Sequence, residues 1–519
     1  MLNIISSAAR RPGLRQKLLS GTALLGTALI GLADPTPARA DQQFLKHGSL
    51  VISSSTYDAT QGAVAALAIG TPLPGPSTAV AGNSYLTIWN NASVDGSFGV
   101  TSAIQLTDID LSNGKVFRSM QMPTDQVVTS FSSKSELGLH VINKWPAVSV
   151  VLVGYANAGV GKLDVSNSDA LPGQDPTNPV TVAFGPGYAF RRTIVSVDEK
   201  ASITYTPTLD YGGNNGRSAL LGSNGLYYMV GNANNGNAST FAPNGTNPDV
   251  TETTGLVVVN PINSSVVSAT IPSATSSEVD PSIQYPLNKV TSSNPLGLDK
   301  PGKDNNYRGI TEFGGALYFT KGSGSNGMDT VYTVKAPNSL PTLYNAATST
   351  IAVVPGFPTD SARATNGNYT PFAVFFANPT TVYVSDEGTG STTDTSSHAG
   401  LQKWTLGSNG SWHLQYVLTK GLIGVVDGNV TGYAGPWPAI TTIGLRNLTG
   451  RINRNGTVTL WATTSTKSAS GDNGADPNKV VEITDQIAAT QLSQVGNESF
   501  TTVAGPVYGT VFRGVGFVE

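Results

Sequence analysis

Short apolar runs that alternate with polar residues recur along almost the whole chain after residue 40. A period of two is typical of β-strands with one buried face, and segments rich in Gly, Asn, Ser and Asp separate the runs. One unit repeats clearly: an arginine opens a strand, and after Arg217, Arg308 and Arg446 a strand with aromatic residues follows. The arginines of this unit are Arg217, Arg308, Arg446 and Arg513. Repetition of such a unit predicts an all-β fold, a closed ring of four-stranded sheets known as a β-propeller.

The positions of the units predict the number of sheets. Two units precede residue 217, and four more begin near residues 217, 308, 371 and 446. We therefore expect six four-stranded blades, with seven as the alternative because faint repeats are easily merged. The last strand, residues 514–518, is expected to pair with residues 49–53, since an unpaired edge would otherwise remain at each end. One β-propeller domain, residues 41–519, would then be closed by its N- and C-terminal strands.

The connections between the expected strands differ in length. First and second strands of a unit are joined by short turns, whereas long polar segments follow the second strands at residues 156–186, 231–254, 321–329, 386–399 and 465–478. Successive connections of an up-and-down sheet alternate between its two ends. The long segments and the starts of the innermost strands, where the arginines lie, should therefore share one face. Variable loops on a fixed scaffold commonly carry a binding site, so we expect the functional surface there.

The first 40 residues follow a different pattern. A basic segment precedes an uncharged run at residues 18–32, and small residues continue to Ala40. This order is typical of a secretory signal peptide, residues 1–40, cleaved before Asp41. The uncharged run is too short to span a membrane as a helix. We therefore expect a periplasmic or secreted protein whose mature form has no membrane span.

Composition and charge narrow the classes of partner and chemistry. The net charge of the chain is −3, and removal of five basic residues and one acidic residue with the signal peptide gives −3 − 4 = −7. Such an acidic protein is not expected to bind nucleic acid. The chain contains no cysteine, which excludes disulfides, thiolate metal sites and cysteine nucleophiles. Stability must therefore come from a large apolar core.

The repeated arginines are the first candidates for a binding site. Arg217, Arg308, Arg446 and Arg513 should lie around one mouth of the central channel, where their forked donors suit an anionic or sugar-like ligand. Tyr307 could add an aromatic face for a sugar ring. The alternative is structural, with each arginine pairing to a carboxylate or carbonyl of the adjacent blade.

Three acidic residues near the same mouth are candidate cation ligands: Asp304, Asp386 and Glu387. Their carboxylates could provide the oxygen ligands that Ca²⁺ or another hard divalent cation prefers. Asp residues also occur in ordinary turns, which is the alternative role. Residues 108–114 resemble the start of a calcium loop, but Ser119 occupies the position that requires a bidentate glutamate. We interpret that segment as a β-hairpin.

Familiar catalytic motifs are missing from the sequence. Residues 322–327 match Gly-x-Gly-x-x-Gly, but a strand follows where a dinucleotide site requires a helix. There is no Gly-x-Ser-x-Gly motif and no His-Glu-x-x-His motif, and the four histidines are scattered. The sequence therefore identifies no nucleophile paired with a base.

Six short motifs are distinctive, and they lie at residues 306–311, 318–327, 400–404, 447–451, 474–479 and 512–515. In these motifs the chain resembles a family of exported bacterial and fungal β-propeller proteins to which no activity is assigned. The resemblance implies fold and export, but no catalytic residue. At the level of fold, the chain is also similar to six-bladed propellers of the gluconolactonase type, which hold a divalent cation in the channel.

Two classes of function follow from these observations. We predict an exported binding or interaction protein that recognises a polar ligand, a glycan or an anionic metabolite, at one mouth of the channel. The alternative is a metal-dependent hydrolase or lactonase with a divalent cation in the channel, held by residues such as Asp386 and Glu387. Metal content distinguishes the two classes.

Overall fold

The computed structural model describes residues 43–56, 101–131, 133–144, 147–160, 192–208, 211, 215–231, 256–261, 270–272, 306–322, 328–335, 339–343, 345, 349–361, 369–390, 398–428, 439–467, 474, 476–507 and 509–519. The chain divides into two compact units, residues 1–33 and 34–519, and every described residue belongs to the second. The expected signal peptide lies outside the described residues.

The described part is built from β-strands in five sheets, with one short 3-10 turn, η5 Leu492–Gln494. The first sheet contains β1 Ser49–Thr56, β2 Thr101–Asp110, β3 Lys115–Gln121, β4 Val127–Ser130, β5 His140–Ile142, β6 Ser149–Ala156, β7 Arg192–Asp198, β8 Ile203–Thr208 and β27 Thr510–Phe517. The second contains β9 Gly216–Leu221, β10 Tyr227–Gly231, β11 Leu256–Val259 and β12 Thr270–Pro272.

The remaining three sheets follow in chain order. The third contains β13 Tyr307–Phe313, β14 Ala316–Lys321, β15 Met328–Lys335, β16 Thr350–Val353 and β17 Asp360–Ser361. The fourth contains β18 Pro371–Asn378, β19 Thr381–Asp386, β20 Gly400–Leu406 and β21 Trp412–Leu418. The fifth contains β22 Val426–Asp427, β23 Ile440–Ile452, β24 Thr457–Lys467, β25 Val480–Gln486 and β26 Thr501–Ala504.

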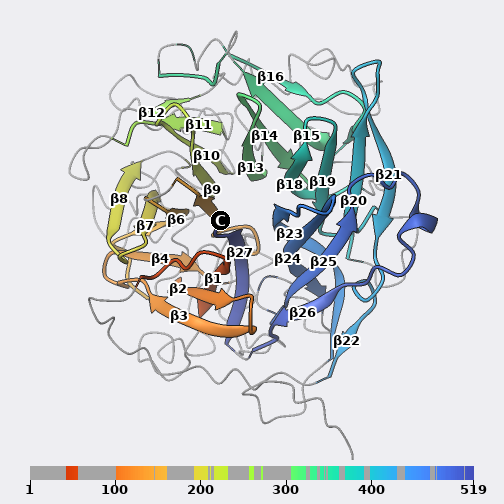
Figure 1. The fold of residues 1–519 in the computed structure, drawn as a ribbon. Coiled ribbons are helices and arrows are strands. Elements are labelled where there is room, and N and C mark those ends of the chain that lie inside the picture. The colour runs from red at the N-terminus through yellow and green to blue at the C-terminus, as the bar shows by residue number, and fades with distance from the viewer. Residues whose placement is uncertain are drawn as a thin grey trace, which may run out of the picture. The chain divides into compact units, whose positions relative to one another are not determined.

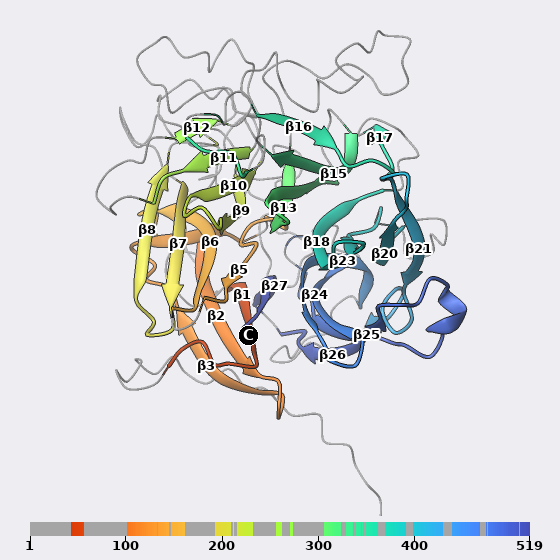
Figure 2. The ribbon, with the colours of Figure 1, turned by 45° about the horizontal axis from the view of Figure 1, so that its top comes forward.

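The sheets form a β-propeller arrangement, as the strand pattern predicted (Figure 1). The innermost strands contact one another in the order β5, β9, β13, β18, β23 and β27, and β27 contacts β5. Figure 2 shows the same sheets from a direction turned by 45°. In the described residues, no helix is long and apolar enough to cross a membrane.

The first and last described strands pair with each other, as predicted. β1 is antiparallel to β27, with Leu50 opposite Phe517 and Val51 opposite Gly516. β2 and β3 continue from β1, so strands from both ends of residues 43–519 make one run, β27-β1-β2-β3. A second run in the same sheet is β5-β6-β7-β8, and β4 links the two by pairing with β2 and β6.

The connections have the lengths that the sequence indicated. Turns between innermost and second strands are short, at residues 222–226, 314–315, 379–380 and 453–456. Longer segments join second to third strands, at residues 157–191, 232–255, 322–327, 387–399 and 468–479. In the run β27-β1-β2-β3, residues 57–100 likewise connect the second strand, β1, to the third, β2.

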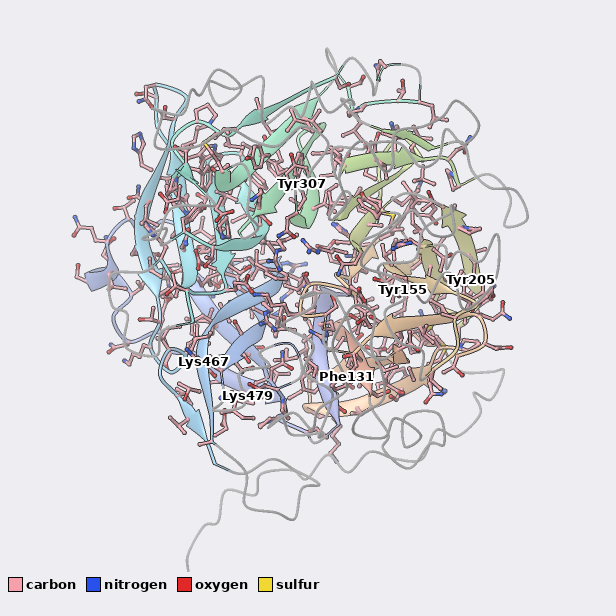
Figure 3. All side chains as sticks on the ribbon, turned by 180° about the vertical axis from the view of Figure 1, so that it is seen from behind. Phe131, Tyr155, Tyr205, Tyr307, Lys467 and Lys479 are labelled. Atoms are coloured by element: carbon pink, nitrogen blue, oxygen red, sulfur yellow. The ribbon has the colours of Figure 1, made fainter. Side chains whose placement is uncertain are left out.

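Apolar side chains fill the space between neighbouring sheets. Figure 3 shows the side chains of the described residues from behind. One such cluster joins Leu220 and Tyr228 of the second sheet to Tyr307, Phe319 and Tyr332 of the third. Equivalent clusters join the third sheet to the fourth and the fourth to the fifth. Burial of apolar surface between sheets therefore supplies the core that a protein without disulfides requires.

Candidate functional site

A β-bulge positions the arginine of each repeated strand. In β13, Arg308 and Gly309 stand opposite the single residue Thr320, because pairing skips from Tyr307 to Ile310. The register also shifts at Arg446 in β23 and at Arg513 in β27. An extra residue bends the strand and redirects its side chain, so the bulge explains why the arginine interrupts an apolar pattern.

Glycine allows neighbouring innermost strands to approach closely beside two of the arginines. A side chain on Gly309 would place its Cβ 2.6 Å from the carbonyl oxygen of Phe372. At Gly514 the equivalent distance to the carbonyl oxygen of Leu137 is 2.4 Å. Both glycines therefore serve close packing beside the arginines.

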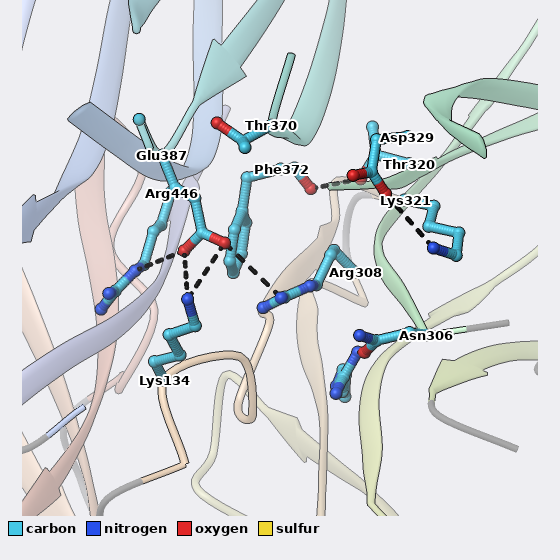
Figure 4. Close-up of polar contacts among 12 residues, drawn as sticks. Lys134, Asn306, Arg308, Thr320, Lys321, Asp329, Thr370, Phe372, Glu387 and Arg446 are labelled. Carbon is cyan, nitrogen blue, oxygen red and sulfur yellow. Dashed lines mark hydrogen bonds and ion pairs between the residues drawn. The ribbon is translucent and has the colours of Figure 1, made fainter. Parts of the chain in front are cut away.

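Four side chains meet at the centre of the arrangement, and we call them the Glu387 cluster: Lys134, Arg308, Glu387 and Arg446 (Figure 4). Glu387 Oε1 lies 3.5 Å from Arg308 Nη2, and Glu387 Oε2 lies 3.4 Å from Arg446 Nε. Lys134 Nζ lies 3.2 Å from each oxygen of the same carboxylate. One carboxylate thus contacts three cationic side chains.

The members of the Glu387 cluster come from distant parts of the chain. Lys134 lies between β4 and β5, Arg308 in β13 and Arg446 in β23. Glu387 follows β19 directly, at the start of one of the longer connections. The prediction that these connections and the arginines share a face is confirmed for this part of the molecule, because Glu387 contacts both Arg308 and Arg446.

Burial and charge set the ionisation of the cluster. Burial raises the pKa of Glu387, but the charges of Lys134, Arg308 and Arg446 outweigh it and hold that pKa at about 2. Burial lowers the pKa of Lys134 to about 8, the charge of Glu387 opposes this decrease, and the charges of Arg308 and Arg446 add to it. The Lys134 side chain remains 38% exposed, whereas that of Arg308 is only 2% exposed. Lys134 is therefore the accessible edge of a buried charged cluster.

The other two arginines have partners of their own. Arg217 donates to Asn306 Oδ1 and, at 3.2 Å, to the carbonyl oxygen of Tyr307 on the next sheet. Arg513 donates to the carbonyl oxygen of Gly474 at 2.8 Å and also to that of Phe131. Both arginines are buried and bind backbone carbonyls, which is the structural role that the sequence left as an alternative.

Tyr307 is fully buried in the apolar cluster between the second and third sheets. Its ring centroid lies 4.6 Å from that of Phe319 and 5.5 Å from that of Tyr332. In that position Tyr307 offers no ring face to a ligand. Phe372 is the aromatic residue beside the cluster, with the Arg308 guanidinium 5.4 Å from its ring centroid.

Asp386 occupies a separate, fully buried position. Its carboxylate accepts hydrogen bonds from the Thr370 amide at 2.8 Å, the Gly388 amide at 2.9 Å and Gln402 Nε2 at 3.1 Å. Burial raises the pKa of Asp386. These bonds fix the end of β19 and so hold Glu387, the next residue, in its place.

The structure offers no support for a cation site at Asp386 and Glu387. The first carboxylate is surrounded by hydrogen-bond donors and the second by cationic side chains, which would repel a metal ion. Across the described ranges, no group of three or more His, Asp and Glu side chains could hold a metal ion. Asp304 lies outside the described residues. Glu387 is instead the shared anionic partner of Lys134, Arg308 and Arg446.

Sequence reasoning missed Lys134. It stands in a Ser-rich segment, residues 131–135, that contains no strand pattern and no recognisable motif. Its approach to Glu387 is a contact between residues far apart in the sequence, which no local signal encodes.

Comparison with known proteins gives no assignment. No protein-family model matches the chain, and no curated protein matches it. Similar solved structures include a variant of the NanB sialidase from Streptococcus pneumoniae, with 8% identity, a TM-score of 0.34 and coverage of 72% of this chain. This chain spans 61% of that sialidase chain.

Two further similar structures come from other enzymes. One is CoXyl43, a β-xylosidase/α-arabinofuranosidase from a compost microbial metagenome, with 11% identity, a TM-score of 0.31 and coverage of 68% of this chain and 92% of that one. Another is an ulvan lyase of a polysaccharide lyase family, with 10% identity and a TM-score of 0.30. The match covers 85% of this chain and 95% of the lyase chain. Likeness at this level carries no functional argument, so function must be argued from the site.

Proposed function

We propose that the protein is an exported β-propeller that binds an anionic ligand, either an acidic sugar of a glycan or an anionic metabolite, at the Glu387 cluster. The observation that carries the proposal is the convergence of Lys134, Arg308 and Arg446 on one carboxylate. These cations come from three separate segments of the chain, so the fold itself assembles the cluster.

The charge of the cluster favours an anion. The charge of Asp476 also acts on Arg446, so three cations and two carboxylates give 3 − 2 = +1 for these five groups. Buried charge is costly unless it is compensated, and a carboxylate, sulfate or phosphate on a ligand would supply compensation. Guanidinium groups bind such anions through two parallel hydrogen bonds.

Access for a ligand and fixed orientation of the donors come from different residues. Lys134 is 38% exposed and can meet a ligand that arrives from solvent. Arg308 is held between Glu387 and the ring of Phe372, so its guanidinium is already oriented before a ligand binds. Preorganised donors lose little conformational freedom on binding, which favours affinity.

We also propose that the propeller is a closed ring of six blades. In this account the runs β27-β1-β2-β3 and β5-β6-β7-β8 are separate blades that β4 joins at their edge. The contacts between successive innermost strands support this account. Export through the signal peptide at residues 1–40 remains part of the proposal.

Matched ligand pairs test the binding function. Glucuronate and glucose differ mainly in one carboxylate, and the same holds for galacturonate and galactose. Calorimetric titration should detect the acids and not the neutral sugars. Lys134→Ala should weaken binding of the acids about tenfold or more, because it removes a charged donor. Arg454→Ala changes an exposed arginine in the short turn between β23 and β24 and serves as the matched control. Equal binding of acidic and neutral sugars, or equal effects of the two variants, would overturn the proposal.

A further inference from the structure

We propose that the segment between β25 and β26, residues 487–500, is a pH-sensitive element, held in place in part by a proton that Glu498 shares with Asp485. Loss of that proton as the pH rises loosens the segment. The groups concerned form a second buried cluster, which we call the Asp485 cluster: Tyr383, Lys403, Tyr416, Asp485 and Glu498. It shares no residue with the Glu387 cluster, so the inference is independent of the proposed anion site.

The segment bridges two sheets. It follows β25 of the fifth sheet, and its turn η5 contacts β21 of the fourth (Figure 1). The Phe500 amide donates to the carbonyl oxygen of Lys420 at 3.0 Å, and Lys420 Nζ donates to that of Gly496 at 3.0 Å. Ala489, Val495 and Phe500 are buried in the apolar cluster between the fourth and fifth sheets. Movement of the segment would therefore expose part of that core.

The carboxylate of Asp485 is the centre of the cluster. Lys403 Nζ lies 2.9 Å from Asp485 Oδ2, and both side chains are 0% exposed. The Tyr416 hydroxyl lies 2.8 Å from Oδ1 and 3.0 Å from Oδ2, and the Tyr383 hydroxyl also donates to Oδ2. These partners come from β19, β20 and β21, whereas Asp485 lies in β25. Lys403 and Asp485 compensate each other's charge, so the cluster without Glu498 is neutral.

Glu498 adds a second carboxyl group to this neutral cluster. Its Oε1 accepts a hydrogen bond of 3.3 Å from the Gln486 amide, whereas its Oε2 is buried and bonds to no donor among the described residues. The Glu498 carboxyl lies within hydrogen-bonding reach of Asp485. Two ionised carboxylates are both acceptors, so this contact is a hydrogen bond only when one of them carries a proton. An ionised Glu498 would also bring the charge to 1 − 1 − 1 = −1, an uncompensated charge at a buried cluster.

Rising pH should therefore weaken the attachment of the segment. Burial raises the pKa of Glu498 from 4.5 to about 8, and the hydrogen bond and charge of Asp485 add to the rise. The Gln486 amide and the charge of Lys403 oppose it. The closed segment thus binds more protons than an open one between pH 4.5 and about 8. Its attachment is strongest below pH 4.5 and weakens progressively as the pH rises to about 8.

Hydrogen–deuterium exchange of the full-length mature protein tests the inference. Exchange is measured at about pH 5.5 and about pH 8.5, and each rate is divided by the intrinsic rate at that pH to give the protection of the amides. We expect the protection of residues 487–500 to fall about tenfold or more between the two conditions. The amides of β24, at the centre of the fifth sheet, should keep their protection.

Glu498→Gln assigns the effect to one proton. Its amide group can still donate to Asp485 and accept from the Gln486 amide, but it does not ionise, so protection of residues 487–500 should be the same at both pH values. Asp125→Asn, which changes an exposed carboxylate, is the matched control and should keep the wild-type response. The inference is overturned if the wild-type segment is equally protected at both pH values, if β24 loosens to the same extent, or if Glu498→Gln responds to pH as the wild type does.

Discussion

The hydroxyl of Thr320 donates a hydrogen bond of 2.6 Å to the carbonyl oxygen of Phe372, on the innermost strand of the next sheet. The same hydroxyl accepts a hydrogen bond from the Gly309 amide at 3.3 Å, inside the bulge of its own sheet. Ser53 makes the equivalent pair of bonds, to the carbonyl oxygen of Leu137 at 2.7 Å and from the Gly514 amide at 2.8 Å. A hydroxyl of a second strand therefore connects the bulge at Arg308 to the innermost strand β18, and the bulge at Arg513 to the segment that precedes β5.

Replacement of Thr320 by valine should measure how much this hydrogen bond stabilises the protein. Valine keeps the shape but leaves the buried Phe372 carbonyl oxygen without this donor, so the free energy of unfolding should fall by about 1–3 kcal/mol. Thr501→Val alters an exposed strand residue and should change the free energy of unfolding by less than about 0.5 kcal/mol. Urea unfolding of the two variants provides the measurement. Equal small effects would mean that the hydroxyl is not needed between the sheets.

Close approach at Gly514 should be essential to packing around the centre. An alanine Cβ there would lie 2.4 Å from the carbonyl oxygen of Leu137 and 2.5 Å from the Cβ of Leu139, so the segment that precedes β5 must move. We expect Gly514→Ala to lower the free energy of unfolding by about 1–3 kcal/mol or more. Gly496→Ala is the control, because its nearest neighbour would be 3.8 Å away. If both variants unfold at the same urea concentration, the strands at the centre have room to adjust.

Protonation of Glu387 should destabilise the protein in acid. Its pKa is held at about 2 in the folded protein, against 4.5 as its ordinary value, so the unfolded chain binds more protons between these limits. The stabilisation is therefore complete above pH 4.5 and is lost as the pH falls through about 2. A shift of this size corresponds to about 3 kcal/mol.

Glu387→Gln isolates that contribution. The variant should be less stable than the wild type at pH 6, because three cations lose the carboxylate they share. Its free energy of unfolding should also fall less steeply between pH 4.5 and pH 3. Parallel curves for the two proteins would show that Glu387 does not titrate with a lowered pKa.

Removal of β27 should abolish cooperative folding if the ring is closed as we propose. Deletion of residues 510–519 leaves β1 without its partner on one side and removes Arg513 together with its bonds to Phe131 and Gly474. Exposed edge strands promote aggregation, so the truncated protein should be aggregation-prone and unfold without a sharp transition. A truncated protein that unfolds in one sharp transition at the wild-type temperature would contradict closure.

Much of the fold could be predicted from local pattern. Alternation of apolar and polar residues places Leu50 and Phe517 on strands, and the need to pair both edges makes those strands neighbours. The bulge could not be predicted, because it depends on two residues, Arg308 and Gly309, standing opposite one residue on another strand. This arrangement of two residues opposite one arises only when the two strands pair.

The candidate site was predicted in part. Arg308, Arg446 and Glu387 were expected at one mouth, and they do meet. Tyr307 could have been assigned to the core, since successive side chains of a strand point to opposite sides and Arg308 points to the centre. Lys134 could not have been predicted as a member of the site, because its position depends on the path of a segment outside the repeated pattern.

Selenate diffraction tests the central claim most directly. Selenate has the shape and charge of sulfate, and its selenium can be located by anomalous scattering in crystals of the mature protein. The anion site predicts selenate within hydrogen-bond distance of Lys134, Arg308 and Arg446, and loss of that selenate in the Arg308→Ala variant. Selenate found only at other places, such as the short turns at residues 314–315 and 455–456, would contradict the claim.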